Sequence, residues 1–81
     1  MFIVVDKKTG RYKSDTGMNS SEDKTGIYEN LYNSIDKSTE KIIEIDDDSP
    51  FIHEINNSIE TGNDFSIQLE AGKMIGLRLL S

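Results

Sequence analysis

Apolar and polar residues alternate in the last part of the chain. From Phe65 to Ala71 every second residue is apolar, and the alternation resumes with Ile75, Leu77 and Leu79. A period of two is typical of strands that bury one face and expose the other. The pattern therefore predicts two antiparallel strands joined by a tight turn around Gly72.

The register of this hairpin depends on the length of its loop, because a slip of one residue turns every side chain to the other face. A two-residue loop at residues 72–73 sets apolar residues opposite Gly76 and Arg78. We therefore expect a three-residue loop, 71–73, which pairs Leu69 with Ile75, Ile67 with Leu77, and Phe65 with Leu79.

A second hairpin is predicted at the start of the chain. Residues 2–5 are β-branched or aromatic, as is typical of strands, and residues 7–10 end in a glycine that suits a turn. The returning strand then sets Tyr12 opposite Val5 and Ser14 opposite Ile3. Because Phe2 and Val4 make the second face of the first strand apolar, this strand is expected inside a sheet or at an interface.

A short amphipathic helix follows a polar segment. Ile27, Leu31 and Ile35 are spaced four residues apart, and Thr25 is a suitable N-cap. Two tyrosines, Tyr28 and Tyr32, flank this stripe. We favour core and boundary packing for them, with a contact patch as the alternative.

The polar segment, residues 14–26, is expected to be a mobile loop. Its single large apolar side chain, Met18, leaves open a binding loop that presents this residue to a partner.

A strand over residues 40–45 and a second helix over residues 50–61 come next. Ser49 is predicted to cap the helix, Pro50 suits its first position, and Gly62 ends it. An apolar stripe marks its buried face: Phe51, Ile52, Ile55 and Ile59.

The resulting order is β-β-α-β-α-β-β, which predicts a single α+β domain over residues 1–81. A crossover that makes strands 40–45 and 65–70 parallel would give a mixed, mostly antiparallel sheet with both helices on one face. We expect the second helix to cover the C-terminal hairpin, with three residues (Ile52, Ile55 and Ile59) packed over six (Phe65, Ile67, Leu69, Ile75, Leu77 and Leu79).

The charge is acidic and unevenly distributed. The 81 residues carry a net charge of −6 and no cysteine, which excludes disulfides and thiolate chemistry. Residues 1–13 have a local net charge of +3, whereas residues 40–60 have a local net charge of −6 and include Asp46, Asp47 and Asp48. An acidic surface argues against direct binding to nucleic acid. Without a recognisable signal peptide or a long apolar span, a soluble, cytoplasmic protein is expected, with no membrane contact.

No motif for catalysis or for a bound group is recognised. His53, the single histidine, is expected on the exposed face of its helix, and no second histidine or cysteine is available to complete a zinc site. The acidic run lacks the spacing of a calcium loop, and Gly72-Lys73 lacks the rest of a phosphate loop. We expect neither an enzyme nor a metal or other cofactor.

Two functions remain open. The first is a small protein-binding module, such as an inhibitor or accessory protein acting on a basic partner, for instance one that binds nucleic acid. Its candidate partner-binding residues are Glu44, Asp46, Asp47, Asp48, Met18, Tyr28 and Tyr32. The second is a structural or self-assembling subunit. The abundance of Ile, Asn and Lys over Ala and Arg is typical of an AT-rich bacterial or phage genome.

A homodimer is suggested by two strands that are apolar on both faces. Met74 and Leu80 give the last strand a second apolar side, as Phe2 and Val4 do for the first strand. The two strands are therefore expected either to be neighbours in one sheet or to meet in a homodimer, and we favour the dimer.

Overall fold

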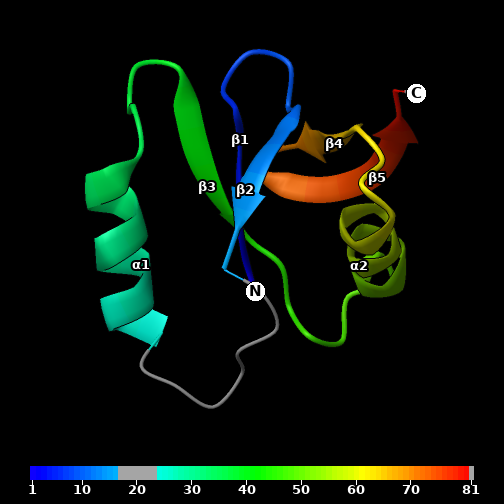
Figure 1. The fold of residues 1–81 in the computed structure, drawn as a ribbon, viewed down its shortest axis with the longest axis horizontal. Coiled ribbons are helices and arrows are strands. Elements are labelled where there is room, and N and C mark those ends of the chain that lie inside the picture. The colour runs from blue at the N-terminus through cyan, green and yellow to red at the C-terminus, as the bar shows by residue number, and fades with distance from the viewer. Residues whose placement is uncertain (17–23, 81) are drawn as a thin grey trace.

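Five strands and two helices form from the residues that the computed structural model describes, 1–16 and 24–80 (Figure 1). In chain order they are β1 (Phe2–Asp6), β2 (Tyr12–Asp15), α1 (Lys24–Ser34), β3 (Glu40–Glu44), α2 (Ile52–Thr61), β4 (Phe65–Glu70) and β5 (Lys73–Leu79). This order confirms the predicted α+β domain.

The strands form two antiparallel sheets rather than one mixed sheet. One sheet has the order β2-β1-β3, and the other is the β4-β5 hairpin. The expected crossover that makes β3 and β4 parallel is wrong, because the two strands belong to different sheets. β3 instead pairs antiparallel with β1, from Phe2↔Glu44 to Asp6↔Glu40. The doubly apolar β1 is thereby the central strand of its sheet, and Phe2 and Val4 are buried. β1 and β5 are therefore not neighbours in one sheet.

The helices lie on different sides of the three-stranded sheet instead of sharing one face (Figure 1). Tyr28 of α1 contacts Phe2, on one face of β1. Ile52 and Ile55 of α2 join the core that contains Ile3, on the other face of β1. Since successive residues of a strand point to opposite faces, two helices are used to bury the two apolar faces of β1.

The two sheets are joined where the β1–β2 turn meets β4. The Ile67 N–H donates to the Gly10 carbonyl oxygen over 2.8 Å, and an isolated bridge links Arg11 to Ser66. Gly10 has a φ of +75°, and a Cβ placed there would lie 2.3 Å from the Ile67 carbonyl oxygen. Only glycine fits this conformation and this close approach without strain.

We predict that Gly10→Ala destabilises the fold by roughly 2–4 kcal/mol, because it adds a backbone clash to the cost of a positive φ. Gly62→Ala is the matched control: its φ is +72°, but nothing lies within 4 Å of the added Cβ. The control should therefore show only the backbone term, about 1–2 kcal/mol. Urea denaturation of both variants measures the difference, and equal losses would contradict a steric role for the junction.

The core lies between β1, α2 and β4. Its buried members are Ile3, Val5, Ile45, Ile52, Ile55, Phe65 and Ile67. The predicted packing of α2 over the hairpin is confirmed for Phe65 and Ile67, and Ile59, Leu69 and Leu77 are partly buried against the same cluster. It is wrong for Ile75 and Leu79, which are 55% and 56% exposed.

The β4–β5 hairpin turns through two residues, not three. Ala71 and Gly72 have φ values of 52° and 79°. Positive φ at both positions is the geometry whose twist matches that of the flanking strands. The expected pairs Phe65↔Leu79 and Ile67↔Leu77 are confirmed. Leu69 pairs with Met74 instead of Ile75, because Ile75 is an extra, bulged residue between Met74 and Gly76.

The β1–β2 hairpin contains a similar irregularity. Val5 pairs with Tyr12 as expected, but a register shift between Val4 and Val5 sets Ile3 opposite Asp15 instead of Ser14. The Tyr12 ring stacks on Phe65 with 4.8 Å between ring centroids. This aromatic pair is a second contact between the two sheets.

The first helix begins earlier than the sequence indicates. α1 starts at Lys24, so Thr25 is a helical residue rather than the N-cap. The expected bounds of the loop, 14–26, are wrong at both ends, because residues 14–15 belong to β2 and residues 24–26 to α1. Met18 lies outside the described residues.

The second helix begins later than expected and ends as expected. α2 starts two residues after Pro50, although the Ser49 hydroxyl still accepts the Phe51 N–H over 3.2 Å. Gly62 is left-handed, with a φ of 72°, and its N–H donates to the Ile59 carbonyl oxygen. The predicted C-terminal glycine is confirmed.

We predict that Ile55→Ala costs roughly 2–5 kcal/mol in unfolding free energy, because the side chain is fully buried and the cavity cannot be filled from solvent. Asn57→Ala, at an exposed position of the same helix, should change stability by less than about 0.5 kcal/mol. Chemical denaturation measures both, and an unchanged midpoint for Ile55→Ala would overturn the described core.

Candidate protein-contact surface

The largest exposed aromatic side chains of the described residues lie side by side on α1. Tyr28 and Tyr32 are 41% and 44% exposed, and no residue of the helix is fully buried. The spacing of four residues places them on one face, where their rings stack with centroids 6.1 Å apart. The rings are thus accessible, as the contact-patch interpretation requires.

Contacts at both ends of the pair fix the ring positions. Tyr28 meets Phe2 edge to face, with 5.6 Å between centroids. The Lys37 Nζ lies 4.4 Å from the centroid of Tyr32, within the range of a cation–π contact. The Lys37 carbonyl oxygen in turn accepts a hydrogen bond from Lys7 over 3.0 Å. Tyr28 therefore both packs against the core strand and remains available to solvent.

Two depressions adjoin the tyrosines on the side of Glu29 and Glu44, and a third adjoins them at the lysines described below. One, of about 490 Å³, is lined by Tyr28, Glu29, Tyr32 and Asn33. The other, of about 480 Å³, lies between α1 and β3 and is lined by Phe2, Lys24, Thr25, Tyr28, Ile42 and Glu44. Tyr28 and Glu44, both candidates from the sequence, thus line one depression, where Lys24 Nζ lies 3.8 Å from Glu44 Oε2.

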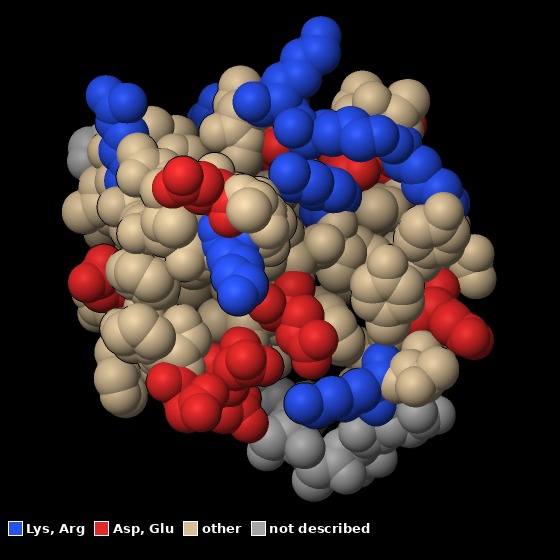
Figure 2. Space-filling view, turned by 180° about the vertical axis from the view of Figure 1, so that it is seen from behind, with Lys and Arg blue, Asp and Glu red and all other residues tan. Residues whose placement is uncertain are grey.

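The acidic run, Asp46 to Asp48, is exposed in the segment that joins β3 to α2. Figure 2 shows Asp and Glu side chains gathered over the lower part of the molecule, where Figure 1 places this segment. None of the three aspartates lines either depression beside the tyrosines. The structure therefore brings Glu44 to the tyrosines and leaves the acidic run beyond the end of β3.

Basic side chains gather at the end of the molecule opposite the acidic run, at the top of Figure 2, and we call this the basic end. We use this name for Lys7, Lys8, Lys37 and Lys41. Lys7, Lys37 and Lys41 line a depression of about 300 Å³ together with Tyr28 and Tyr32, so the basic end borders the tyrosine pair. Lys7, Lys8 and Lys41 line another depression of about 360 Å³. The sequence indicated the positive charge of residues 1–13, but not the nearby Lys37 and Lys41. The antiparallel pairing Val5↔Lys41 brings Lys41 to this end.

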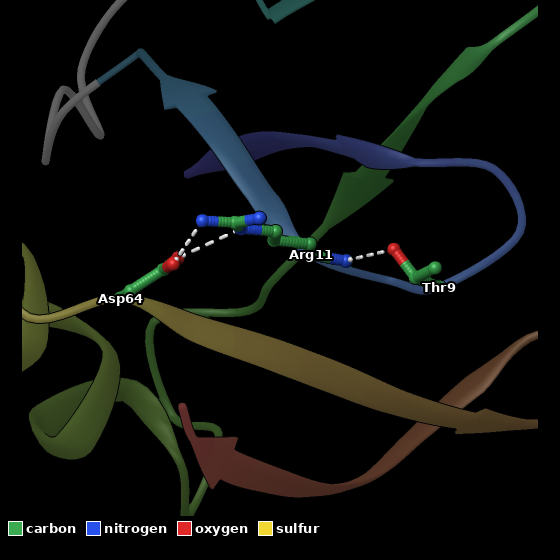
Figure 3. Close-up of polar contacts among 3 residues, drawn as sticks. All are labelled: Thr9, Arg11 and Asp64. Atoms are coloured by element: carbon green, nitrogen blue, oxygen red, sulfur yellow. Dashed lines mark hydrogen bonds and ion pairs between the residues drawn. The ribbon is translucent and has the colours of Figure 1, made fainter. Parts of the chain in front are cut away.

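An ion pair strengthens the junction of the two sheets (Figure 3). The Arg11 guanidinium donates to both carboxylate oxygens of Asp64, with Nε 3.2 Å from Oδ1. The Thr9 hydroxyl accepts the Arg11 N–H over 3.3 Å. The Asp64 carboxylate raises the pKa of Arg11. Because Arg11 is exposed, the pair orients the turn more than it stabilises the fold.

The carboxylate of Asp6 holds the turn between β1 and β2. It accepts the N–H groups of Lys8 and Thr9 over 2.8 Å and 2.9 Å. Hydrogen bonds from the backbone N–H of Thr9 and of Lys8 lower the pKa of Asp6 from its usual 3.8. The same arrangement recurs before β3, where bonds from the hydroxyl and N–H of Ser38 lower the pKa of Asp36.

We predict a pH-dependent contribution from Asp6. Because its folded pKa lies below 3.8, the contribution is complete above that value and is lost as the pH falls through the folded pKa. Asp6→Asn should therefore lower the urea midpoint at neutral pH and converge with the wild type in strong acid. Glu70→Gln, which removes one exposed charge elsewhere, is the control. A gap that does not narrow in acid would contradict the role of this carboxylate.

Among residues 1–16 and 24–80, no group of three or more His, Cys, Asp or Glu side chains is placed to hold a metal ion. His53 is exposed on α2, the position that the sequence predicted. Neither described helix has the length and hydropathy needed to cross a membrane.

In comparisons with known proteins, no family model, curated protein or solved structure matches this chain. The surface is therefore interpreted from its own geometry.

Proposed function

We propose that the protein is a small protein-binding module that docks on a basic surface of another protein through Tyr28, Tyr32 and Glu44, with Asp46–Asp48 as an outer acidic flank. The observation that supports the proposal is the stacked, half-exposed tyrosine pair on a helix with no buried residue. Tyrosine is enriched at the energetic centres of protein interfaces, because it offers a large apolar surface with one polar end.

The distribution of charge favours a basic partner. Glu29 and Glu44 line the depressions beside Tyr28, and the acidic run follows Glu44 by a few residues. The basic end lies at the opposite side of the molecule from the acidic segment (Figure 2), and it reaches the tyrosine pair only at Lys7, Lys37 and Lys41, with the Lys37 Nζ over the Tyr32 ring. A molecule polarised in this way turns its acidic side toward a positive surface during approach, which raises the association rate more than the affinity.

A basic surface that ordinarily holds nucleic acid is one natural target for such a module, which would then act as an inhibitor or accessory protein. The carboxylates would occupy positions otherwise taken by phosphates. We propose no catalytic step and no bound cofactor for this function.

Affinity capture from nuclease-treated lysate of the native cell tests the proposal, followed by binding kinetics with the purified partner. We predict that Tyr32→Ser accelerates dissociation, since it removes a central aromatic contact and leaves the core untouched. The variant with Asp46→Asn, Asp47→Asn and Asp48→Asn should slow association at low salt and match the wild type at high salt, where exposed charges are screened.

A charge-matched control separates position from net charge. The variant with Glu54→Gln, Glu60→Gln and Glu70→Gln removes three exposed carboxylates on α2 and β4. If both triple variants slow association equally, net charge alone is responsible and the acidic flank is wrong. If Tyr32→Ser binds as the wild type does, the tyrosine surface is wrong.

A further inference from the structure

The described sheets have four edge strands, β2, β3, β4 and β5, which differ in how they protect their unpaired side. The outer side of β4 meets the β1–β2 turn at Gly10 and Arg11. β2 has only four residues and exposes Lys13, and three of the five residues of β3 are charged: Glu40, Lys41 and Glu44. Short length and charge are the usual means of preventing one edge from pairing with another. β5 is the longest of them, with seven residues. Lys73, Arg78 and the bulge at Ile75 protect it in part, but it exposes two large apolar side chains, Ile75 and Leu79.

Backbone groups of β5 point away from its hairpin partner. The Leu80 N–H donates to Asp64, and the Ile67 N–H on β4 points the other way, to Gly10. Hydrogen bonding alternates along an antiparallel pair, so the N–H and C=O groups of Leu77 and Leu79, paired with Ile67 and Phe65, face outward. Among the described strands, β5 pairs with β4 alone. Its outer edge thus offers unpaired donors and acceptors.

The sequence of β5 is complementary to itself. If two copies pair antiparallel about Leu77, the outward-facing backbone of each Leu77 meets the other. The same register sets Ile75 opposite Leu79 of the second copy, twice, by symmetry. Two exposed apolar side chains in each copy thereby cover each other, which is the arrangement required of an isologous interface.

Gly76 supports the same register. A glycine inside a strand often marks a place where another backbone or side chain approaches closely. Pairing about Leu77 sets Arg78 of the second copy opposite Gly76. Gln68 Oε1 lies beside this glycine, 3.0 Å from where a Cβ would stand. The Gln68 side chain thus already occupies the space beside Gly76, and an arginine donor placed opposite this glycine meets a carbonyl acceptor there.

Charge also selects β5 as the meeting surface. Two chains of net charge −6 repel each other, and residues 71–80 carry Lys73 and Arg78 but no acid. In the register about Leu77 neither cation faces its own copy, so no like charges lie directly opposite each other.

We propose that β5 pairs with β5 of a second copy of this chain, antiparallel and centred on Leu77, to join the two hairpins into one four-stranded sheet. The inference rests on β5 alone and does not depend on the proposed function, which concerns α1 and the acidic side. It places the homodimer contact at Ile75, Leu77 and Leu79, rather than at the first strand.

Sedimentation equilibrium of the purified chain at micromolar concentrations tests the proposal. The wild type should have roughly twice the monomer mass of 9.1 kDa. Ile75→Lys combined with Leu79→Lys sets two pairs of like charges opposite each other and should weaken dimerisation roughly tenfold. Ile75→Lys combined with Leu79→Glu sets opposite charges in the same places and should restore much of the dimer.

Controls separate this edge from other interfaces. His53→Lys combined with Asn57→Lys adds two positive charges on the exposed face of α2 and should leave the dimer intact. Circular dichroism checks that every variant is folded. A wild-type mass of 9.1 kDa overturns the proposal. So does a dimer whose dissociation constant is unchanged by Ile75→Lys combined with Leu79→Lys. If the two charge variants are equally monomeric, the register about Leu77 is wrong.

Discussion

The close approach of Gly10 to Ile67 is the contact on which the rest of the fold depends. A two-stranded hairpin is at best marginally stable alone, so β4 and β5 depend on packing against the three-stranded sheet and α2. The Ile67 N–H bonds to Gly10, and the Tyr12–Phe65 stack lies on neighbouring residues. Since the glycine has no room for a side chain, one backbone position decides whether the two hairpins meet.

Local patterns predicted the elements, whereas the pairing of distant strands did not follow from them. Alternation located β4 and β5, and the cap at Gly62 located the end of α2. The parallel crossover failed because β1, apolar on both faces, needs neighbours on both sides and takes β3 as one of them. The bulge at Ile75 was not predictable from the alternation, because a two-residue turn and one extra residue nearly reproduce the pattern of a three-residue turn.

The candidate surface was predictable residue by residue but not as an assembly. Exposed aspartates at a turn and tyrosines beside an apolar stripe are visible in the sequence. That Tyr28 and Glu44 share a depression follows from α1 packing beside β3, which no local pattern encodes. The basic end was missed for a related reason, since Lys41 reaches Lys7 only through the antiparallel pairing of β3 with β1. Met18 lies outside the described residues.

The two proposed surfaces are compatible, because α1 and β5 lie on different sides of the central strands (Figure 1). A dimer through β5 would leave both tyrosine pairs free and hold them in one particle, which increases the avidity for a partner with repeated sites. Salt acts on the two contacts in opposite directions. Screening reduces the repulsion between two chains of net charge −6 and so favours the dimer, but it weakens an attraction to a basic partner. A rise in ionic strength therefore strengthens the contact at the apolar edge of β5 and weakens the contact at the acidic side of the same small domain.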